Sequence, residues 1–137
     1  MRVVIDTNVV ASAIFFGGNP QKVIDEMMNN RIDAYASAEI LEEYTETIEY
    51  LKNKFPGKAP KIPLIGIESK CHVIEVSSKV DICRDPDDNK FIECALDSKC
   101  YYIVSGDKDL LTIKKYDDIE IVTVAEFLKI IGKYLGP

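Results

Sequence analysis

Apolar residues along the chain form short continuous runs that alternate with stripes at helical spacing. The runs predict buried strands, because each is too short for a helix and several end at a polar residue. The predicted strands are Arg2–Ile5, Asp33–Ala36, 73–76, 101–105 and Ile119–Val122.

Helices are predicted in the intervals between these strands. They cover residues 8–15, the stretch after the break at Gly17, Gly18 and Pro20, the long stripe after Ser37, residues 64–71, the stretch opened by Asp85-Pro86, and Val124–Leu135. The last of these is entered by Thr123 with Glu126 three residues later, which is a capping box. The segment 52–63, from Lys52 to Pro63, is rich in Pro and Lys and is predicted to be a surface loop or lid.

Regular alternation of strands and helices favours an α/β fold. A mostly parallel central sheet would be covered by helices on both faces, with right-handed crossovers. In such sheets ligands bind beyond the carboxyl ends of the strands. We therefore look for functional residues that directly follow strands.

The composition is that of an ordinary globular protein. The 137 residues are 47% hydrophobic and 29% charged, which indicates one packed domain over residues 1–137. We expect a cytoplasmic protein, since the N-terminus lacks signal-peptide features and no stretch approaches the roughly 18 apolar residues of a membrane helix. The four cysteines include no Cys-x-x-Cys pair and are expected to be buried free thiols.

The net charge of −6 argues against non-specific binding to nucleic acid, because the field of the molecule repels phosphates. It leaves a nuclease open, since divalent cations can neutralise acids gathered in one pocket. The only histidine, His72, has no partner motif and is expected to be structural.

Asp6 ends the first predicted strand, and Asp107 follows the strand 101–105. Both acids should project from the same edge of the sheet. The alternative is that Asp6 caps the following helix and that Asp107 lies in a turn.

Two helical acids are predicted to face the same edge. At 100° per residue, Glu43 lies on the flank of the apolar stripe of its helix, whereas Glu42 points away from it. Glu43 is alternatively one of several solvated acids on a charged helix face.

Asp88 is the second of these acids. It lies one turn before the apolar face of the helix that follows Pro86, and on that same face, while Asn89 is predicted to face away. A helix dipole alone could also explain an acid at the position of Asp88.

Carboxylates brought together in this way would repel one another strongly and must take up protons or cations. An oxygen-only site without His or Cys suits Mg²⁺ or Mn²⁺. Such ions can activate a water for attack on a phosphodiester. Asn8 and Ser105 are close in sequence to Asp6 and Asp107 and could steady that water or a phosphate, although capping roles are equally open.

These residues occur in four motifs that together resemble the PIN domain. The motifs are Val-Ile-Asp-Thr-Asn-Val-Val, Ile-Leu-Glu-Glu-Tyr, Asp-Pro-Asp-Asp-Asn-Lys-Phe-Ile-Glu-Cys-Ala and Ile-Val-Ser-Gly-Asp-Lys-Asp-Leu-Leu, which span residues 3–111. Among PIN proteins the chain looks most similar to the VapC-like toxins of prokaryotic toxin–antitoxin systems.

The resemblance implies a three-layer α/β/α fold and a Mg²⁺- or Mn²⁺-dependent ribonuclease. It also implies a frequent homodimer and often a small inhibitory antitoxin. The acids of the family match Asp6, Glu43, Asp88 and Asp107, and accessory polar positions match Asn8, Ser105 and Asp109. The family often carries Thr where this chain has Ser105, a change that keeps the hydroxyl.

Two other functions remain as alternatives. An aspartate-nucleophile phosphatase also places an Asp after its first strand, but it needs a second Asp two residues later, where this chain has Asn8. A catalytically silent PIN fold that serves as a binding module usually lacks the acids, and this chain keeps all four. An RNA-processing role is the alternative to a toxin. Surface cations at Lys54, Lys58, Lys61, Arg84, Lys90 and Lys108 could contact an RNA backbone.

Overall fold

The computed structural model describes all residues, 1–137, around a six-stranded sheet with the order β3-β2-β1-β4-β6-β5. The strands are β1 (Arg2–Ile5), β2 (Asp33–Ala36), β3 (His72–Val73), β4 (Tyr102–Val104), β5 (Lys115–Tyr116) and β6 (Ile119–Val122). All neighbouring pairs are parallel except β5 with β6. The predicted mostly parallel α/β sheet is therefore confirmed.

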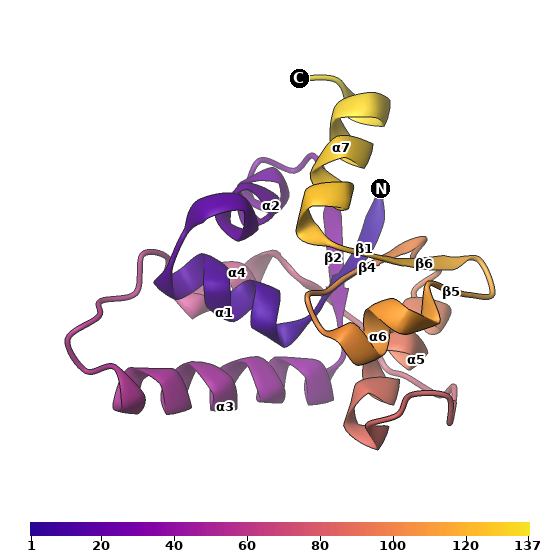
Figure 1. The fold of residues 1–137 in the computed structure, drawn as a ribbon, viewed down its shortest axis with the longest axis horizontal. Helices are drawn as coiled ribbons and strands as arrows, with labels where there is room; N and C mark the ends of the chain where they lie inside the picture. Colours follow the sequence, from indigo (N-terminus) through magenta and orange to yellow (C-terminus); the bar gives the residue numbers. More distant parts are fainter.

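Helices cover both faces of this sheet. They are α1 (Thr7–Phe15), α2 (Gly18–Met28), α3 (Ala38–Lys54), α4 (Leu64–Lys70), the 3₁₀ helix η1 (Pro86–Asp88), α5 (Asn89–Asp97), α6 (Lys108–Ile113) and α7 (Val124–Leu135). In Figure 1, α1 and α2 lie on one side of the central strands and α5 lies on the other. Val3, Val4 and Ile5 are all nearly completely buried although successive residues of a strand face opposite sides. Both faces of β1 are therefore covered.

Several boundaries differ from the sequence prediction for local reasons. α2 already begins at Gly18, because Gly17 and Gly18 take positive φ angles of 73° and 66° that connect it tightly to α1. Pro20 then falls in the first helical turn, where its missing N–H costs nothing. α3 runs to Lys54, so the predicted loop begins only at Phe55. The short elements α6 and β5 were not predicted.

The predicted strand 73–76 is shortened to His72–Val73, and a helix holds the backbone farther along the chain. Three side chains on one stripe of α5, Asn89, Glu93 and Asp97, accept five backbone N–H groups of residues 77–83 at 2.7–3.2 Å. These bonds take the place of a strand partner. Asn89 is 8% exposed, so the prediction that it faces away is wrong.

The cysteines and the histidine form no disulfide and no metal-ligand group. All four cysteines are free, as expected; three are buried, and Cys71 is partly buried. His72 stacks on Tyr35 with a centroid distance of 4.8 Å. No helix is both long enough and apolar enough to span a membrane.

Candidate active site

Asp6 and Ser105 meet at the carboxyl edge of the sheet. Because β1 pairs with β4 so that Ile5 lies opposite Val104, the next residue of each strand lies beside that of the other. The Ser105 hydroxyl donates to Asp6 Oδ2 at 2.7 Å. Asp6 is 4% exposed and Ser105 is fully buried. The hydroxyl therefore fixes the direction of a buried carboxylate.

Asp107 begins the helix that follows β4. Its carboxylate accepts the backbone N–H of Asp109 at 3.0 Å and so caps α6. Its own backbone N–H donates to Ser105 Oγ, also at 3.0 Å. Asp109 itself lies 3.8 Å from the exposed Arg84. Ser105 thus connects Asp6 to Asp107, and Asp109 lies farther out.

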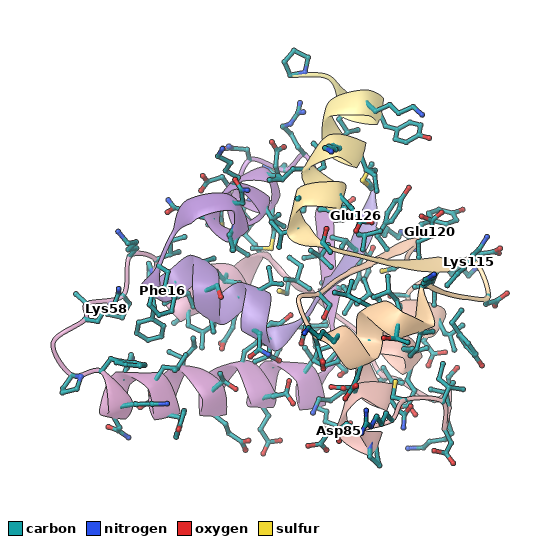
Figure 2. All side chains as sticks on the ribbon, in the orientation of Figure 1. Phe16, Lys58, Asp85, Lys115, Glu120 and Glu126 are labelled. Atoms are coloured by element: carbon teal, nitrogen blue, oxygen red, sulfur yellow. The ribbon has the colours of Figure 1, made fainter.

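Asp88 lies where η1 becomes α5, within hydrogen-bonding reach of Asp107. This segment begins at Asp85, which Figure 2 labels below the strands, and Asp85 caps η1 through the N–H of Asp87 at 3.0 Å. Burial, together with the charge of Asp107 and a hydrogen bond to its side chain, raises the pKa of Asp88 from 3.8 to about 7. Asp88 therefore keeps its proton to higher pH than an ordinary carboxyl group, because a nearby negative charge disfavours its ionised form.

The pKa of Asp6 is raised as well, from 3.8 to about 6. Burial is the largest cause, and the hydrogen bond from Ser105 opposes it. The charges of Asp107 and Glu43 raise the pKa further. The acids of this edge are thus close enough to influence one another electrostatically, although they come from four separate elements of the fold.

Glu43 reaches the same edge from α3, but it carries its own counter-charge. Lys90 of α5 places its Nζ 2.6 Å from Glu43 Oε1, and the Lys90 side chain is only 9% exposed. The Thr7 hydroxyl donates to the other oxygen, Oε2. Glu43 is 27% exposed. Both oxygens of Glu43 therefore have protein partners.

Tyr44, the next residue of α3, fixes that helix to the end of β1. Its hydroxyl donates to the backbone carbonyl of Ile5, the residue before Asp6. Tyr44 is 2% exposed, and burial raises its pKa well above the ordinary value. This bond sets the position of Glu43 relative to Asp6.

Most of the predicted site residues lie close together in the structure. Two residues that were not predicted, Lys90 and Thr7, lie beside them. Asp6, Asp88, Asp107 and Ser105 are in contact or within electrostatic reach. Glu42 is exposed, as predicted, and Asp87 is exposed as well. Asn8 is exposed in the first turn of α1 and makes no side-chain hydrogen bond.

Lys90 and Thr7 were not predicted as site residues. From the sequence alone Lys90 is one of several surface cations, because most lysines of a protein surface are solvated. Thr7 directly follows Asp6, and its neighbour Asn8 was chosen instead. Only the contact between α3 and α5 reveals Lys90.

The fit of these acids to a metal ion depends on their arrangement and on the chemistry of their oxygen atoms. No group of three or more Asp, Glu, His or Cys side chains is arranged closely enough to hold one as the side chains stand. The chemistry of the donors nevertheless fits a hard divalent cation, because Asp6 and Asp88 hold protons to unusually high pH that such a cation would displace. A groove of about 570 Å³ lies elsewhere, between α3, α4 and residues 60–63.

Comparisons with known proteins match this picture of the fold. The model of the PIN domain family matches residues 2–109. The uncharacterized protein MJ1680 of Methanocaldococcus jannaschii is 34% identical over 148 aligned positions, which cover 99% of this chain and 95% of that protein. No solved structure matches the chain.

Proposed function

The chain belongs to the PIN domain family, whose fold is of the nuclease type, and we propose that it is a metal-dependent ribonuclease. Asp6, Glu43, Asp88 and Asp107 form its acidic site. The observation that carries this proposal is the carboxyl edge itself, where Asp6 and Asp88 have pKa values raised to about 6 and about 7. A site that concentrates negative charge in this way favours cations over other ligands.

The residues of the chain have distinct tasks in this proposal. Mg²⁺ or Mn²⁺, when bound, would lower the pKa of a water molecule and stabilise the leaving oxygen of a phosphodiester. Asp6 would be a metal ligand whose carboxylate orientation is fixed, because its Oδ2 accepts a hydrogen bond from the Ser105 hydroxyl. Asp88 would exchange its proton for the cation, and Asp107 beside it would be a further ligand. No side chain needs to act as a nucleophile.

We also propose endonuclease action on RNA and a homodimer, on the basis of the resemblance to VapC-like toxins. The same resemblance supports a toxin that a small antitoxin inhibits, with RNA processing as the alternative role. Growth arrest on expression, relieved by co-expression of a small neighbouring gene, supports the toxin. Unimpaired growth of cells that contain active enzyme contradicts it.

The proposal is tested by incubating end-labelled single-stranded and structured RNAs with the purified protein in Mg²⁺, Mn²⁺ or EDTA. Asp88→Asn is compared with Asp87→Asn, because Asp87 is the exposed neighbour of Asp88. We expect wild type and Asp87→Asn to cleave only with metal, and Asp88→Asn and Asp6→Asn to lose at least a hundredfold in rate. Circular dichroism checks that each variant is folded.

Two results would contradict the ribonuclease. Equal cleavage by Asp88→Asn and wild type would mean that the activity lies elsewhere. Hydrolysis of a simple aryl phosphate without any cleavage of RNA would favour the phosphatase. Absence of both activities together with absence of Mn²⁺ binding would favour a binding module.

A further inference from the structure

Lys90 is an unusual residue for a site that is otherwise acidic. Its side chain is 9% exposed, and its Nζ lies 2.6 Å from Glu43 Oε1. A buried ammonium group is costly unless a carboxylate partner compensates for its lost hydration. The close contact with Glu43 supplies that partner, so the two side chains form an ion pair inside the site.

The acidic edge is divided into two parts by this ion pair. On one side Glu43 is occupied, because Lys90 contacts one of its oxygens and the Thr7 hydroxyl contacts the other. On the other side Asp6, Asp88 and Asp107 are without a cationic partner, since none of them takes part in a salt bridge. Only this second part lacks positive charge.

We propose that Lys90 occupies the place beside Glu43 that a second divalent cation would take, so that the site binds a single cation on Asp6, Asp88 and Asp107. Two-metal nuclease sites place their ions about 3.5–4 Å apart to clamp the attacking and leaving oxygens. An ammonium group is a compact point charge with three donors, and Lys90 uses one of them on Glu43. This inference rests on the proposed function.

The inference assigns Lys90 as a positioning residue with two consequences for the chain. It holds Glu43 in place without a metal, and it excludes a second cation by charge repulsion. Glu43 then contributes little to the affinity of the bound cation. Removal of the Lys90 charge frees the Glu43 carboxylate and creates a second place for a cation.

Binding of Mn²⁺ alone, measured by isothermal titration and by the electron paramagnetic resonance signal of free Mn²⁺, tests these consequences without any assay of activity. We expect one Mn²⁺ per wild-type chain and two per chain of Lys90→Met. Lys90→Arg keeps the charge and should bind one. The exposed control Glu42→Gln should bind one with an affinity within about threefold of wild type.

Two cations on the wild-type chain would overturn the inference without any need for a variant. A folded Lys90→Met that still binds one, with unchanged affinity, would overturn it too. If Lys90→Met does not fold, Lys90→Gln is used in the same titration.

The inference and the proposed function fail in different ways. Two bound cations together with metal-dependent RNA cleavage would leave the ribonuclease standing and reject the role of Lys90. One cation on wild type and two on Lys90→Met, without cleavage of any RNA, would support Lys90 and reject the ribonuclease. No binding of Mn²⁺ to any of the proteins would reject both.

Discussion

Asp6 holds its proton to higher pH in the folded chain than in the unfolded chain. Its pKa is raised from 3.8 to about 6, so between these values the folded state binds more protons. The stability contributed by protonated Asp6 is complete below pH 4 and is lost as the pH rises through about 6. A shift of two units corresponds to roughly 3 kcal/mol at most. We therefore expect metal-free wild type to lose stability over this range, relative to Asp6→Asn.

Thermal unfolding in EDTA at pH 4.5, 6 and 8 measures this difference. The melting temperature of Asp6→Asn minus that of wild type should grow with pH. Addition of Mn²⁺ at pH 8 should stabilise wild type and leave Asp6→Asn nearly unchanged. A difference that is constant with pH would show that Asp6 is ionised throughout.

Ser105 offers a second prediction at the scale of single residues. Its hydroxyl bonds Asp6 Oδ2 at 2.7 Å and lowers the pKa of that acid. Ser105→Ala should destabilise the protein by about 1 kcal/mol and should shift the midpoint of Mn²⁺ binding to higher pH. Ser105→Thr keeps the hydroxyl and is the matched control. Identical pH profiles for Ser105→Ala and Ser105→Thr would contradict the role of the hydroxyl.

At the scale of elements, the stripe Asn89, Glu93 and Asp97 of α5 controls the order of residues 77–83. Asn89 Oδ1 accepts two backbone N–H groups, at 3.2 and 3.0 Å. Asn89→Ala leaves both without this partner, so a loss of roughly 1–3 kcal/mol is expected. Hydrogen exchange should become faster at residues 77–83 and at the neighbouring Asp88.

The matched control for this prediction lies in another helix. Thr123 caps α7 by accepting the N–H of Glu126 at 3.1 Å, and Thr123→Ala should cost about 1 kcal/mol. It should leave the exchange of residues 77–83 unchanged. Equal protection of this segment in Asn89→Ala and Thr123→Ala would mean that the α5 stripe does not hold it.

The sequence predicted the elements whose signals are local. β1, β2, β6, α3 and α7 followed from apolar runs, helical stripes and caps, and the Thr123 cap was found as predicted. α6 and β5 were missed because six and two residues are too few to show a period. β3 was predicted at 73–76 and is found at His72–Val73. The binding of residues 77–83 by side chains of α5 was not predicted, because no local pattern encodes such a contact.

The residues of the candidate site were likewise predictable only where their signals are local in the sequence. Asp6 and Asp107 could be placed from the strands that precede them. Asp88 and Glu43 could be placed from helical geometry, which separated Glu43 from Glu42. Contacts between elements could not be placed. Lys90 pairs with Glu43 only because the fold brings α5 beside α3, and each helix alone gives no sign of it.

The distribution of charge over the whole molecule leads to a last prediction about RNA. The chain has a net charge of −6, yet residues 50–67 contain four lysines and no acid. Near residues 50–67, two exposed aromatic rings each have a lysine ammonium group beside them. Lys58 lies 4.3 Å from the ring of Phe16, beside which Figure 2 labels it, and Lys54 lies 5.7 Å from the ring of Tyr50. Cations interleaved with aromatic rings are typical of surfaces that bind single-stranded nucleic acid.

This end of the molecule is also within reach of the acids. α1 begins beside Asp6 and ends just before Phe16, while α3 carries Glu43 near its start and ends at Lys54. Both helices run in the same direction in Figure 1. At 1.5 Å per residue, the distance along either helix is about 15 Å, which a strand of a few nucleotides can cover. RNA cut at the acids would extend over this surface.

We therefore expect the double variant Lys54→Glu/Lys58→Glu to bind single-stranded RNA more weakly while its fold remains intact. If both lysines contact phosphates, the slope of log affinity against log salt should decrease in magnitude by about 1.4, or 0.7 for each contact. Lys133→Glu is the control, since Lys133 likewise lies over an exposed ring, that of Tyr134 at 5.4 Å, but near the end of α7. An equal loss of affinity per charge in both variants would assign the effect to net charge. A loss with a changed salt slope in the Lys54/Lys58 variant alone would assign it to this surface.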